Sequence, residues 1–368
     1  MKGLYIHIPF CIKKCDYCDF ISFSGKEMCF EKYIQKLAEE MKEYNGEEIN
    51  TVFIGGGTPT VLSASLITKL CTDIKRYFNL SDDTEWTIEV NPGTLTDEKI
   101  NSMLEGGINR ISVGVQSFND EELKVIGRIH NAQTAYNTII KLDKAGFKNI
   151  SIDLMESLPF QTEASLKNTL KTAMDLPLKH ISVYSLIIED NTPLKVKYDS
   201  GVFNLPDEDS DRDLYALTKK YLSGFGFNRY EISNYSKKGY ESRHNLKYWN
   251  LDEYIGLGVA AHSFVGNKRF SNTDSLEKYL SGDFRSGESE ILTANDRMGE
   301  YMMLGLRKTA GVSACDFKTR FNREIYSVYG NTLKKYINTG FMKEENGFFS
   351  LTDKGLDVSN SIMCEFLV

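Results

Sequence analysis

The chain begins with the stretch Y-I-H-I-P-F-C-I-K-K-C-D-Y-C-D-F (residues 5–20), in which a short apolar strand runs directly into three cysteines. Cys11, Cys15 and Cys18 follow a C-x3-C-x2-C spacing, and Phe20 stands where a further thiolate could have come. A [4Fe–4S] cluster held by protein alone takes four thiolates. Three thiolates leave one iron without a protein ligand, and an open coordination position is what a metal needs in order to engage a substrate directly.

Two simpler interpretations of these cysteines are a zinc site and unliganded core thiols. Structural zinc usually takes four ligands in paired knuckles, and the sequence has no second C-x2-C and no H-x3-H. Seven cysteines are an odd number and are unevenly spread, which in a reducing compartment favours metal binding over disulfides. We interpret Cys29, Cys71, Cys315 and Cys364 as small, half-buried apolar residues.

The composition is that of a globular protein of the cytoplasm. Of 368 residues, 41% are apolar and 26% are charged, and both values are ordinary. The sequence shows no apolar run near the roughly 18 residues of a membrane helix, and its N-terminus lacks the features of a signal peptide. The net charge of −7 gives no reason to expect the clustered basic surface that nucleic acids require. We therefore expect a cytoplasmic protein that binds no nucleic acid.

The first half of the chain alternates short β-rich runs with helical patterns. Such alternation predicts parallel strands joined by helical crossovers. Six units are too few for a closed eight-unit barrel, so we predict an α/β fold built on a partial (β/α)6 barrel. The predicted strands cover residues 4–8, 51–54, 86–90, 111–115, 150–154 and 181–186, and two of the predicted helices cover 30–42 and 65–77.

The alternation stops after about residue 190. A winged-helix-like α+β module is predicted at the end of the chain, with three helices (296–308, 314–321, 327–338) and a two-stranded wing within 341–355. Its ten Lys and Arg residues against nine Asp and Glu do not form the basic stripe of a DNA reader. Before it we expect a helix (207–226), a polar aromatic segment (229–250) and a Gly-rich strand-like run (254–264). The expected domains are therefore a barrel over 1–190, a barrel extension over 191–290 and a C-terminal domain over 291–368.

Four polar residues fall at or near the carboxyl ends of separate predicted strands, namely Glu89, Gln116, Asp153 and Tyr184. Barrel-type α/β folds place their chemistry at that edge. One acidic residue in a strand can be a structural salt bridge, but four polar residues at equivalent edges favour a functional site. The segment I-G-G-G-T-P-T (54–60) also follows a strand. Its glycines let backbone amides approach a ligand, and the helix start favours a carboxylate.

The three-cysteine loop directly after a strand, with the Gly-rich segment one strand later, resembles the radical SAM superfamily. The resemblance implies that three thiolates hold a [4Fe–4S] cluster and that the amino group and carboxylate of S-adenosylmethionine (SAM) complete the open iron. Electron transfer from the cluster can then break a carbon–sulfur bond and create a radical. Phe20, in place of a further thiolate, leaves room for the cofactor.

Further motifs narrow the resemblance to the oxygen-independent coproporphyrinogen III oxidase group. They are E-V-N-P (89–92), S-V-G-V-Q-S-F (112–118), G-R-I-H (127–130) and S-I-D-L-M (151–155). In that group, matching residues bind SAM beside the cluster, and others contact a second SAM. The first set corresponds here to Tyr5, Tyr17, Gly56, Gly57, Thr58 and Glu89, and the second to Gln116, Arg128 and Asp153.

Two departures separate the chain from the oxidase itself. The oxidase carries a cysteine at the position of Phe20, and it has an N-terminal arm ahead of the first strand. The segment R-H-N-L-K-Y-W (243–249) instead matches the H-N-x-x-Y-W motif of the heme chaperone HemW family, and E-Y-M-M-L-G-L-R (300–307) resembles that family too.

The H-N-x-x-Y-W motif makes chemical sense as a heme site at His244, Asn245, Tyr248 and Trp249. Imidazole ligates heme iron, and Tyr and Trp rings offer flat apolar faces to a porphyrin. The alternative is a histidine that satisfies loop backbone beside a tryptophan that anchors the core. The sequence has no C-x-x-C-H for covalent attachment, so any heme should be held reversibly. His7, His180 and His262 are lesser candidates as iron ligands.

Three functions follow from these resemblances. The first is a heme chaperone that delivers heme to respiratory cytochromes at the membrane, with the cluster and SAM supporting homodimer formation and release or catalysing a reaction. The second is the oxidative decarboxylation of coproporphyrinogen III, against which Phe20 and the missing arm count. The third is a radical enzyme that modifies heme.

Overall fold

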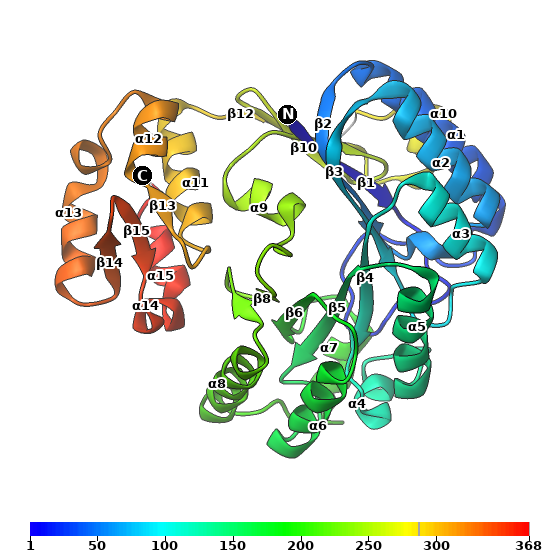
Figure 1. The fold of residues 1–368 in the computed structure, drawn as a ribbon, viewed down its shortest axis with the longest axis horizontal. Helices are drawn as coiled ribbons and strands as arrows, with labels where there is room; N and C mark the ends of the chain where they lie inside the picture. Colours follow the sequence, from blue (N-terminus) through cyan, green and yellow to red (C-terminus); the bar gives the residue numbers. More distant parts are fainter. Residues whose placement is uncertain (286–287, 368) are drawn as a thin grey trace.

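The computed structural model describes residues 1–285 and 288–367 and contains the predicted partial barrel. Six strands, each parallel to the next, lie in the order β1-β2-β3-β4-β5-β6, and helices connect them on the outer side (Figure 1). The strands are β1 (Lys2–Ile8), β2 (Glu48–Gly56), β3 (Asn79–Val90), β4 (Arg110–Gln116), β5 (Asn149–Glu156) and β6 (His180–Ser185). The helices are α1 (Phe30–Met41), α2 (Ala64–Tyr77), α3 (Asp97–Gly106), α4 (Asp120–Val125), α5 (Ala132–Ala145) and α6 (Glu163–Met174), with short 3-10 turns η1 (Glu27–Cys29), η2 (Lys42–Tyr44) and η3 (Pro59–Val61).

The segment between the barrel and the C-terminal domain extends the same sheet at both ends, to the order β12-β11-β10-β9-β1-β2-β3-β4-β5-β6-β8-β7. The strands added are β7 (Asn228–Arg229), β8 (Asn234–Ser236), β9 (Tyr254–Leu257), β10 (His262–Val265), β11 (Lys268–Ser271) and β12 (Ser289–Ile291). The helices of this segment are α7 (Pro193–Asp199), α8 (Glu208–Gly224), α9 (Arg243–Trp249) and α10 (Leu276–Ser281).

The prediction of one continuous strand-like run over 254–264 was wrong. The chain reverses after β9, where Gly258 has φ +99° and Ala260 has φ +57°. Both values lie in the left-handed region, which turns a strand back on itself. Phe264 of β10 then pairs antiparallel with Tyr254 of β9, so the run forms a hairpin that lies between β1 and β11 in the sheet.

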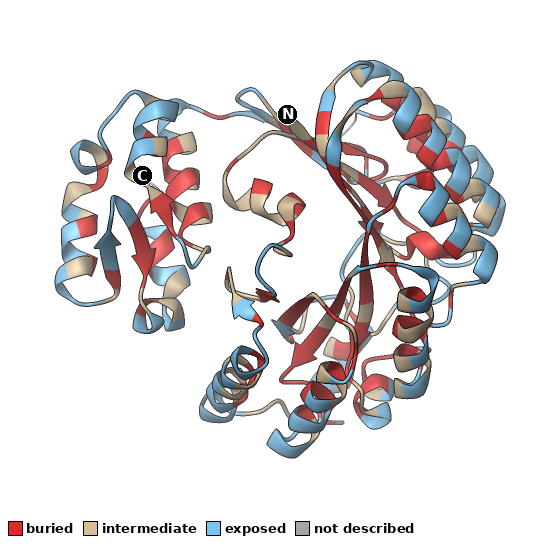
Figure 2. Ribbon diagram, in the orientation of Figure 1, coloured by how far each residue is buried: buried red, intermediate tan, exposed pale blue. Residues whose placement is uncertain are grey.

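Apolar side chains of the parallel strands form the main core. Ile6, Ile54, Ile88, Ile111 and Ile150 lie at neighbouring positions of β1 to β5 and are at most 1% exposed. Burying each such side chain contributes roughly 1.5–3 kcal/mol. Figure 2 shows the consequence, because the strands are almost entirely buried while the outer faces of the helices are exposed. In the part of the chain that the structure describes, no helix has the length and apolar character needed to cross a membrane.

The C-terminal residues form the predicted winged-helix-like α+β module, coloured orange to red in Figure 1. The hairpin of β14 and β15 is the wing, and β13 pairs with β15. A second hydrophobic cluster lies inside the module and also takes in Leu251 and Phe264 of the sheet extension. The division of the chain into the three expected domains stays a prediction. The elements are α11 (Ala294–Gly305), β13 (Val312–Ser313), α12 (Ala314–Phe321), α13 (Ile325–Asn338), β14 (Met342–Glu345), β15 (Phe348–Leu351), α14 (Asp353–Asp357) and α15 (Ser359–Cys364).

Candidate functional site

The cysteine loop follows β1 and is held by backbone hydrogen bonds at several points. Cys11 N–H donates to the carbonyl of Phe23 (3.0 Å), and Phe23 N–H donates to that of Pro9 (2.7 Å). Within the loop, Asp16 N–H donates to Ile126 O (3.0 Å). The Asp16 carboxylate also pairs with Lys197 Nζ at 2.6 Å. The loop is thus anchored both to the end of β1 and to the segment after α4.

The three cysteines of the loop supply the donor atoms that an iron–sulfur cluster takes. Cys11, Cys15 and Cys18 are partly exposed and form no disulfide. Among residues 1–285 and 288–367, no three His, Cys, Asp or Glu side chains lie close enough together to hold one ion. A lone zinc keeps its thiolates about 2.3 Å away, whereas a [4Fe–4S] cluster takes one thiolate per iron and so spreads its ligands. Three free, partly exposed thiols on one loop are therefore a donor set of the kind that such a cluster takes.

Hydrogen-bond donors face the cysteine sulfurs. Thr58 Oγ1 lies 3.6 Å from Cys11 Sγ as donor, and an Arg128 Nη1–H donates to Cys15 Sγ at 3.3 Å. Burial raises the pKa of Cys11, and burial raises that of Cys18 to about 11. Iron would remove these thiol protons, since a coordinated thiol is deprotonated. The donors are placed to stabilise the thiolates that result.

The Gly-rich segment packs its backbone directly on the cysteine loop. Gly56 has φ +107°, and a Cβ at this position would lie 2.4 Å from the His7 ring. A Cβ on Gly57 would lie 2.7 Å from Phe10 O. Gly57 N–H donates to Ile8 O (2.9 Å) and Thr58 N–H to Phe10 O (2.7 Å). These two amides therefore extend the pairing of β1 with β2, and Gly is required because the two backbones approach so closely.

Two partly buried carboxyl groups lie on the inner face of the barrel. The Gly56 N–H donates to Glu89 Oε2 at 3.0 Å. Burial, followed by the charge of Asp153, raises the pKa of Glu89 to about 8. Ser112 Oγ lies 3.3 Å from both Asp153 oxygens, and burial raises the pKa of Asp153 as well. A cationic ligand placed between these groups would favour their ionised forms.

Arg128 connects the cysteine loop with the strand ends. Its Nη2 donates to Gly114 O (2.5 Å) and to Asn91 Oδ1 (3.0 Å). The Asn91 side chain in turn donates to Thr58 Oγ1 at 2.8 Å. Asn91 was not predicted as a site residue, although it stands in the E-V-N-P motif two residues after Glu89. Its position between Thr58 and Arg128 shows that it orients both side chains.

Gln116, Tyr5 and Tyr17 are the other residues that the sequence assigned to SAM. Gln116 ends β4 with φ +69° and is 8% exposed. A left-handed backbone at a residue other than glycine is a strained conformation that functional sites often keep. Tyr5 donates its hydroxyl hydrogen to Nδ1 of His7 (2.9 Å), because His7 Nε2–H already donates to Ile21 O (2.9 Å). Tyr17 packs in a small hydrophobic cluster with Ile126.

The predicted heme residues lie on helix α9, which packs against β2 and is held by Glu85 of β3. Glu85 Oε2 and Oε1 accept the N–H groups of Arg243 (3.0 Å) and His244 (2.9 Å). The His244 side chain is 1% exposed. Its Nδ1 lies 2.9 Å from Thr51 Oγ1 and its Nε2 lies 2.9 Å from Tyr248 Oη. Burial lowers the pKa of His244 to about 3, so the ring is neutral and both nitrogens are engaged.

The other members of the H-N-x-x-Y-W motif are also packed against protein. The Tyr248 ring meets Tyr254 edge-on at 4.7 Å between centroids. The Arg307 guanidinium covers the Trp249 ring, 4.4 Å from its centroid. Asn245 donates its backbone N–H to the N-cap Ser242. In this conformation both ring nitrogens of His244 are hydrogen-bonded, to hydroxyl groups and not to loop backbone, and Trp249 is half-buried beneath Arg307. Ligation of heme by His244 stays a prediction and requires the loss of one ring hydrogen bond.

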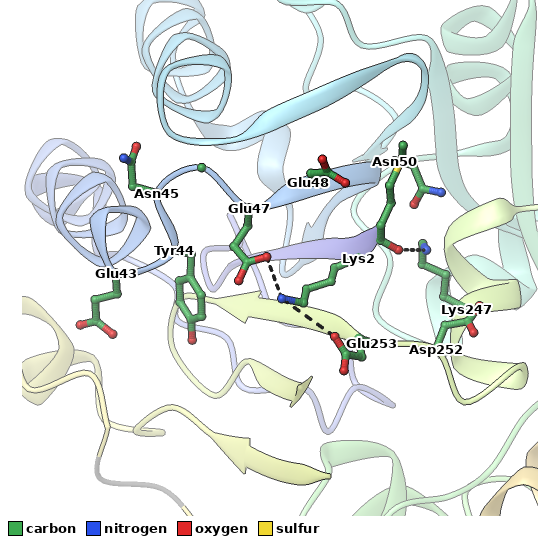
Figure 3. Close-up of a pocket in the computed structure, with 12 residues that line it drawn as sticks. Lys2, Glu43, Tyr44, Asn45, Glu47, Glu48, Asn50, Lys247, Asp252 and Glu253 are labelled. Carbon is green, nitrogen blue, oxygen red and sulfur yellow. Dashed lines mark hydrogen bonds and ion pairs between the residues drawn. The ribbon is translucent and has the colours of Figure 1, made fainter. Parts of the chain in front are cut away.

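A polar pocket opens at the opposite edge of the sheet, beside the start of β1 and β2 (Figure 3). Lys2 Nζ lies 2.7 Å from Glu47 and 3.9 Å from Glu253, and Lys247 Nζ donates to Met1 O at 3.1 Å. Because its lysines are already engaged and it lies far from the cysteine loop along the strands, this pocket is given no role in the site.

Comparisons with known proteins agree with the geometry. A family model described as Radical SAM superfamily matches residues 5–173, and one described as HemN C-terminal domain matches residues 292–358. Among solved structures, coproporphyrinogen III oxidase (HemN) from Escherichia coli superposes with a TM-score of 0.87 at 22% identity, covering 100% of this chain and 90% of that one. That likeness shows the fold.

Relatives that match over the whole length of the chain identify its family. Heme chaperone HemW of Lactococcus lactis subsp. lactis is 38% identical over 370 residues, which cover 100% of this chain and 97% of the relative. The proteins of the same name from Bacillus subtilis and Escherichia coli K12 are 36% and 33% identical, with coverage of 100% and 99% of this chain and 99% and 98% of theirs. The chain therefore belongs to the heme chaperone HemW family.

Proposed function

We propose that this chain is a heme chaperone that binds heme, a [4Fe–4S] cluster and SAM. The observation that carries the proposal is 33–38% identity over essentially the full length to relatives that bear the name heme chaperone HemW. The three-cysteine loop and the winged C-terminal module are both within the matched region. The oxidase alternative rests on a structural likeness at 22% identity, which concerns the fold.

In this proposal Cys11, Cys15 and Cys18 hold the cluster, and the open iron takes the amino group and carboxylate of SAM. Once bound, the cluster supplies the electron that radical SAM chemistry needs. The chain's own part is positioning. Gly56 and Gly57 hold the β2 turn against the cysteine loop, and Glu89 presents a carboxyl group beside that turn. Arg128 donates a hydrogen bond to one cluster ligand.

The remaining residues that the sequence assigned to SAM line the same edge. Tyr5, Tyr17 and Thr58 surround the loop and turn, while Gln116 ends β4 and Asp153 lies within β5. Two partly buried carboxyl groups with raised pKa values suit a positively charged ligand such as the sulfonium of SAM. Whether one or two SAM molecules occupy the edge is decided by the stoichiometry of SAM binding at equilibrium.

Delivery implies a client, and we propose respiratory cytochromes at the membrane as the recipients of heme. We also propose that the active form is a homodimer whose assembly depends on the cluster. The size of the protein in solution, compared with and without the reconstituted cluster, tests the second point. A mass that stays monomeric in both states would rule it out.

The test of the function is a hemin titration of anaerobically cluster-reconstituted protein, followed by absorption. A chaperone binds hemin saturably near one equivalent and leaves the porphyrin mass unchanged. Weak binding without saturation would overturn the proposal. If reduced, SAM-loaded protein converted coproporphyrinogen III to protoporphyrinogen, the oxidase function would replace it. A change in the mass of the bound heme would instead indicate a heme-modifying enzyme.

A further inference from the structure

Helix α7 is fixed to the residues between two of the proposed cluster ligands, Cys15 and Cys18. The N–H of Leu194 donates to Asp16 O at 2.8 Å. Lys197 Nζ lies 2.6 Å from Asp16 Oδ2. Asp16 follows Cys15 directly in the chain. Because one residue accepts both contacts, whatever fixes this part of the cysteine loop also fixes α7.

The inner side of α7 shares a hydrophobic core with the same loop. Leu194 is fully buried and belongs to a small cluster that includes Ile126 and Phe203. Tyr17 of the cysteine loop packs against this cluster. A helix of seven residues has little stability of its own, so these apolar contacts and the two contacts to Asp16 determine its position.

The outer side of α7 and its surroundings expose apolar side chains. Val196 is 66% exposed and Tyr198 is 40% exposed, and Val202 in the turn after the helix is 57% exposed. The buried ring of Phe203 joins two exposed aromatic rings, since its centroid lies 5.8 Å from that of Tyr198 and 6.5 Å from that of Phe160. Phe160 is 60% exposed. We call Phe160, Val196, Tyr198 and Val202 the α7 patch, and exposed apolar side chains gathered in this way mark an interaction surface.

Two opposite charges on α7 accompany the patch. Lys195 Nζ lies 2.6 Å from Asp199 Oδ1, one helical turn away, and the two side chains are 33% and 55% exposed. Within the described part of the chain, neither residue makes another ion pair.

This arrangement of charges is self-complementary. In a contact with two-fold symmetry, the same surface of each subunit meets the other, so each residue pair occurs twice. If α7 lies antiparallel to its own copy, Lys195 faces Asp199 of the partner subunit, and Asp199 faces Lys195 of the partner subunit. An apolar surface that carries one charge of each sign in this order suits a second copy of the chain better than a partner of a single charge sign.

We propose that the α7 patch, with Lys195 and Asp199, is the surface through which two copies of the chain associate, and that the cysteine loop controls it through Asp16. The inference rests on the proposed function, because it locates the homodimer proposed there. Ligation of Cys15 and Cys18 fixes the loop between them. Asp16 then holds α7 in one orientation, and the patch is presented to the partner. Without ligation the loop is less constrained, and the dimer is weaker.

The test changes the two charges one at a time and measures association by sedimentation velocity over a range of concentrations, with the cluster reconstituted. Lys195→Glu and Asp199→Lys should each weaken the dimer by about tenfold or more, because like charges then meet at both ends of the contact. An equimolar mixture of the two variants should form a heterodimer about as tight as the wild-type dimer, because each introduced charge then meets an opposite charge. The ion pair within α7 is broken in both variants, so it cannot cause this recovery.

Matched variants control for charge and exposure. Asp143→Lys and Lys148→Glu break an exposed ion pair of 3.5 Å next to the start of β5, at the opposite edge of the sheet, and should leave the dimer unchanged. Val196→Asp should weaken the dimer, whereas Val358→Asp, at a valine of the C-terminal module that is 41% exposed, should not. The absorption of the cluster and the unfolding midpoint check that every variant is loaded and folded.

The coupling to the loop has its own variant. Asp16→Asn keeps the size of the side chain but removes the charge that pairs with Lys197, so it should weaken the dimer while iron content stays normal. Unchanged association of Asp16→Asn would overturn the coupling. Unchanged association of both charge variants, or a mixture no tighter than either variant alone, would overturn the interface while leaving the homodimer intact. A wild type that stays monomeric with its cluster would instead refute the homodimer itself.

Discussion

At the scale of single residues, the three cysteines of the loop have different surroundings. Thr58 faces Cys11, and Arg128 faces Cys15. Hydrogen bonds to the sulfur ligands are one of the means by which a protein sets the reduction potential of an iron–sulfur cluster. The guanidinium at Cys15 therefore places a fixed positive charge beside one ligand, in addition to any contact that it makes with SAM.

Replacing Cys15 by alanine tests the cluster assignment. Cys15→Ala should abolish the broad thiolate-to-iron absorption near the boundary of the visible and ultraviolet, and bound iron should fall, because only two thiolates remain. The matched control is Cys29→Ala, since Cys29 is also partly exposed but packs against the barrel core outside the loop. The assignment fails if Cys15→Ala keeps normal iron content together with that absorption band.

At the scale of elements, helix α9 shows how a short helix is fixed by partners far away in the chain. Its N-terminus is capped by Ser242 and by the carboxylate of Glu85 in β3. Thr51 of β2 holds the His244 ring. A seven-residue helix is too short to be stable alone, so these contacts and the packing of Tyr248 keep α9 against the barrel.

Removing the Glu85 carboxylate should loosen this helix. Glu85→Ala leaves two N–H groups at the start of α9 without acceptors, and losing a cap of this kind costs about 1–2 kcal/mol of unfolding free energy. The backbone amides of residues 243–249 should exchange faster in a hydrogen–deuterium measurement. Glu48→Ala, at an exposed position of neighbouring β2, is the control and should change neither quantity. Equal protection of α9 in wild type and Glu85→Ala would contradict the capping role.

The sequence predicted the helices and strands better than it predicted the surroundings of single side chains. The six parallel strands, the helices over 314–321 and 327–338 and the wing were found, because strand alternation and helix periodicity are local patterns. The chain reversal after β9 was not predicted, because alanine rarely adopts the left-handed backbone conformation that Ala260 has here, and the sequence gives no sign of it. A His244 side chain engaged by protein, and not by heme, was predicted only as an alternative. Its partners Thr51 and Glu85 are 193 and 159 residues distant in the chain, and no local pattern connects such positions.

At the scale of the whole molecule, the sheet and its extension are joined through a buried carboxyl group. Glu156 at the end of β5 is 2% exposed. It accepts hydrogen bonds from Ser185 of β6 (3.2 Å) and from Thr218 of α8 (3.0 Å). Burial raises the pKa of Glu156 from 4.5 to about 7. Folding therefore makes this group take up a proton near neutral pH, and the stability of the molecule becomes linked to pH.

The sign of the linkage follows from the raised pKa. Below pH 4.5 the group is protonated in both states and costs nothing. Between pH 4.5 and about 7 the unfolded state has lost this proton while the folded state still keeps it. The free energy of unfolding therefore falls as the pH rises across this window, and above it the folded state carries a buried charge. The cost at pH 8 is about 3 kcal/mol by the usual conversion. Glu156→Gln cannot ionise, and the Ser185 and Thr218 hydroxyls can rotate to pair with its amide.

Glu156→Gln should therefore have a larger free energy of unfolding than the wild type at pH 8, by about 2–3 kcal/mol, and nearly the same value at pH 5. Urea unfolding of both proteins at the two pH values measures the difference. Glu105→Gln, at an exposed site on α3, should follow the wild type at both pH values. If the Glu156→Gln and wild-type free energies kept a constant separation from pH 5 to pH 8, the carboxyl group would not be the source of the pH dependence, and its proton would not be taken up on folding.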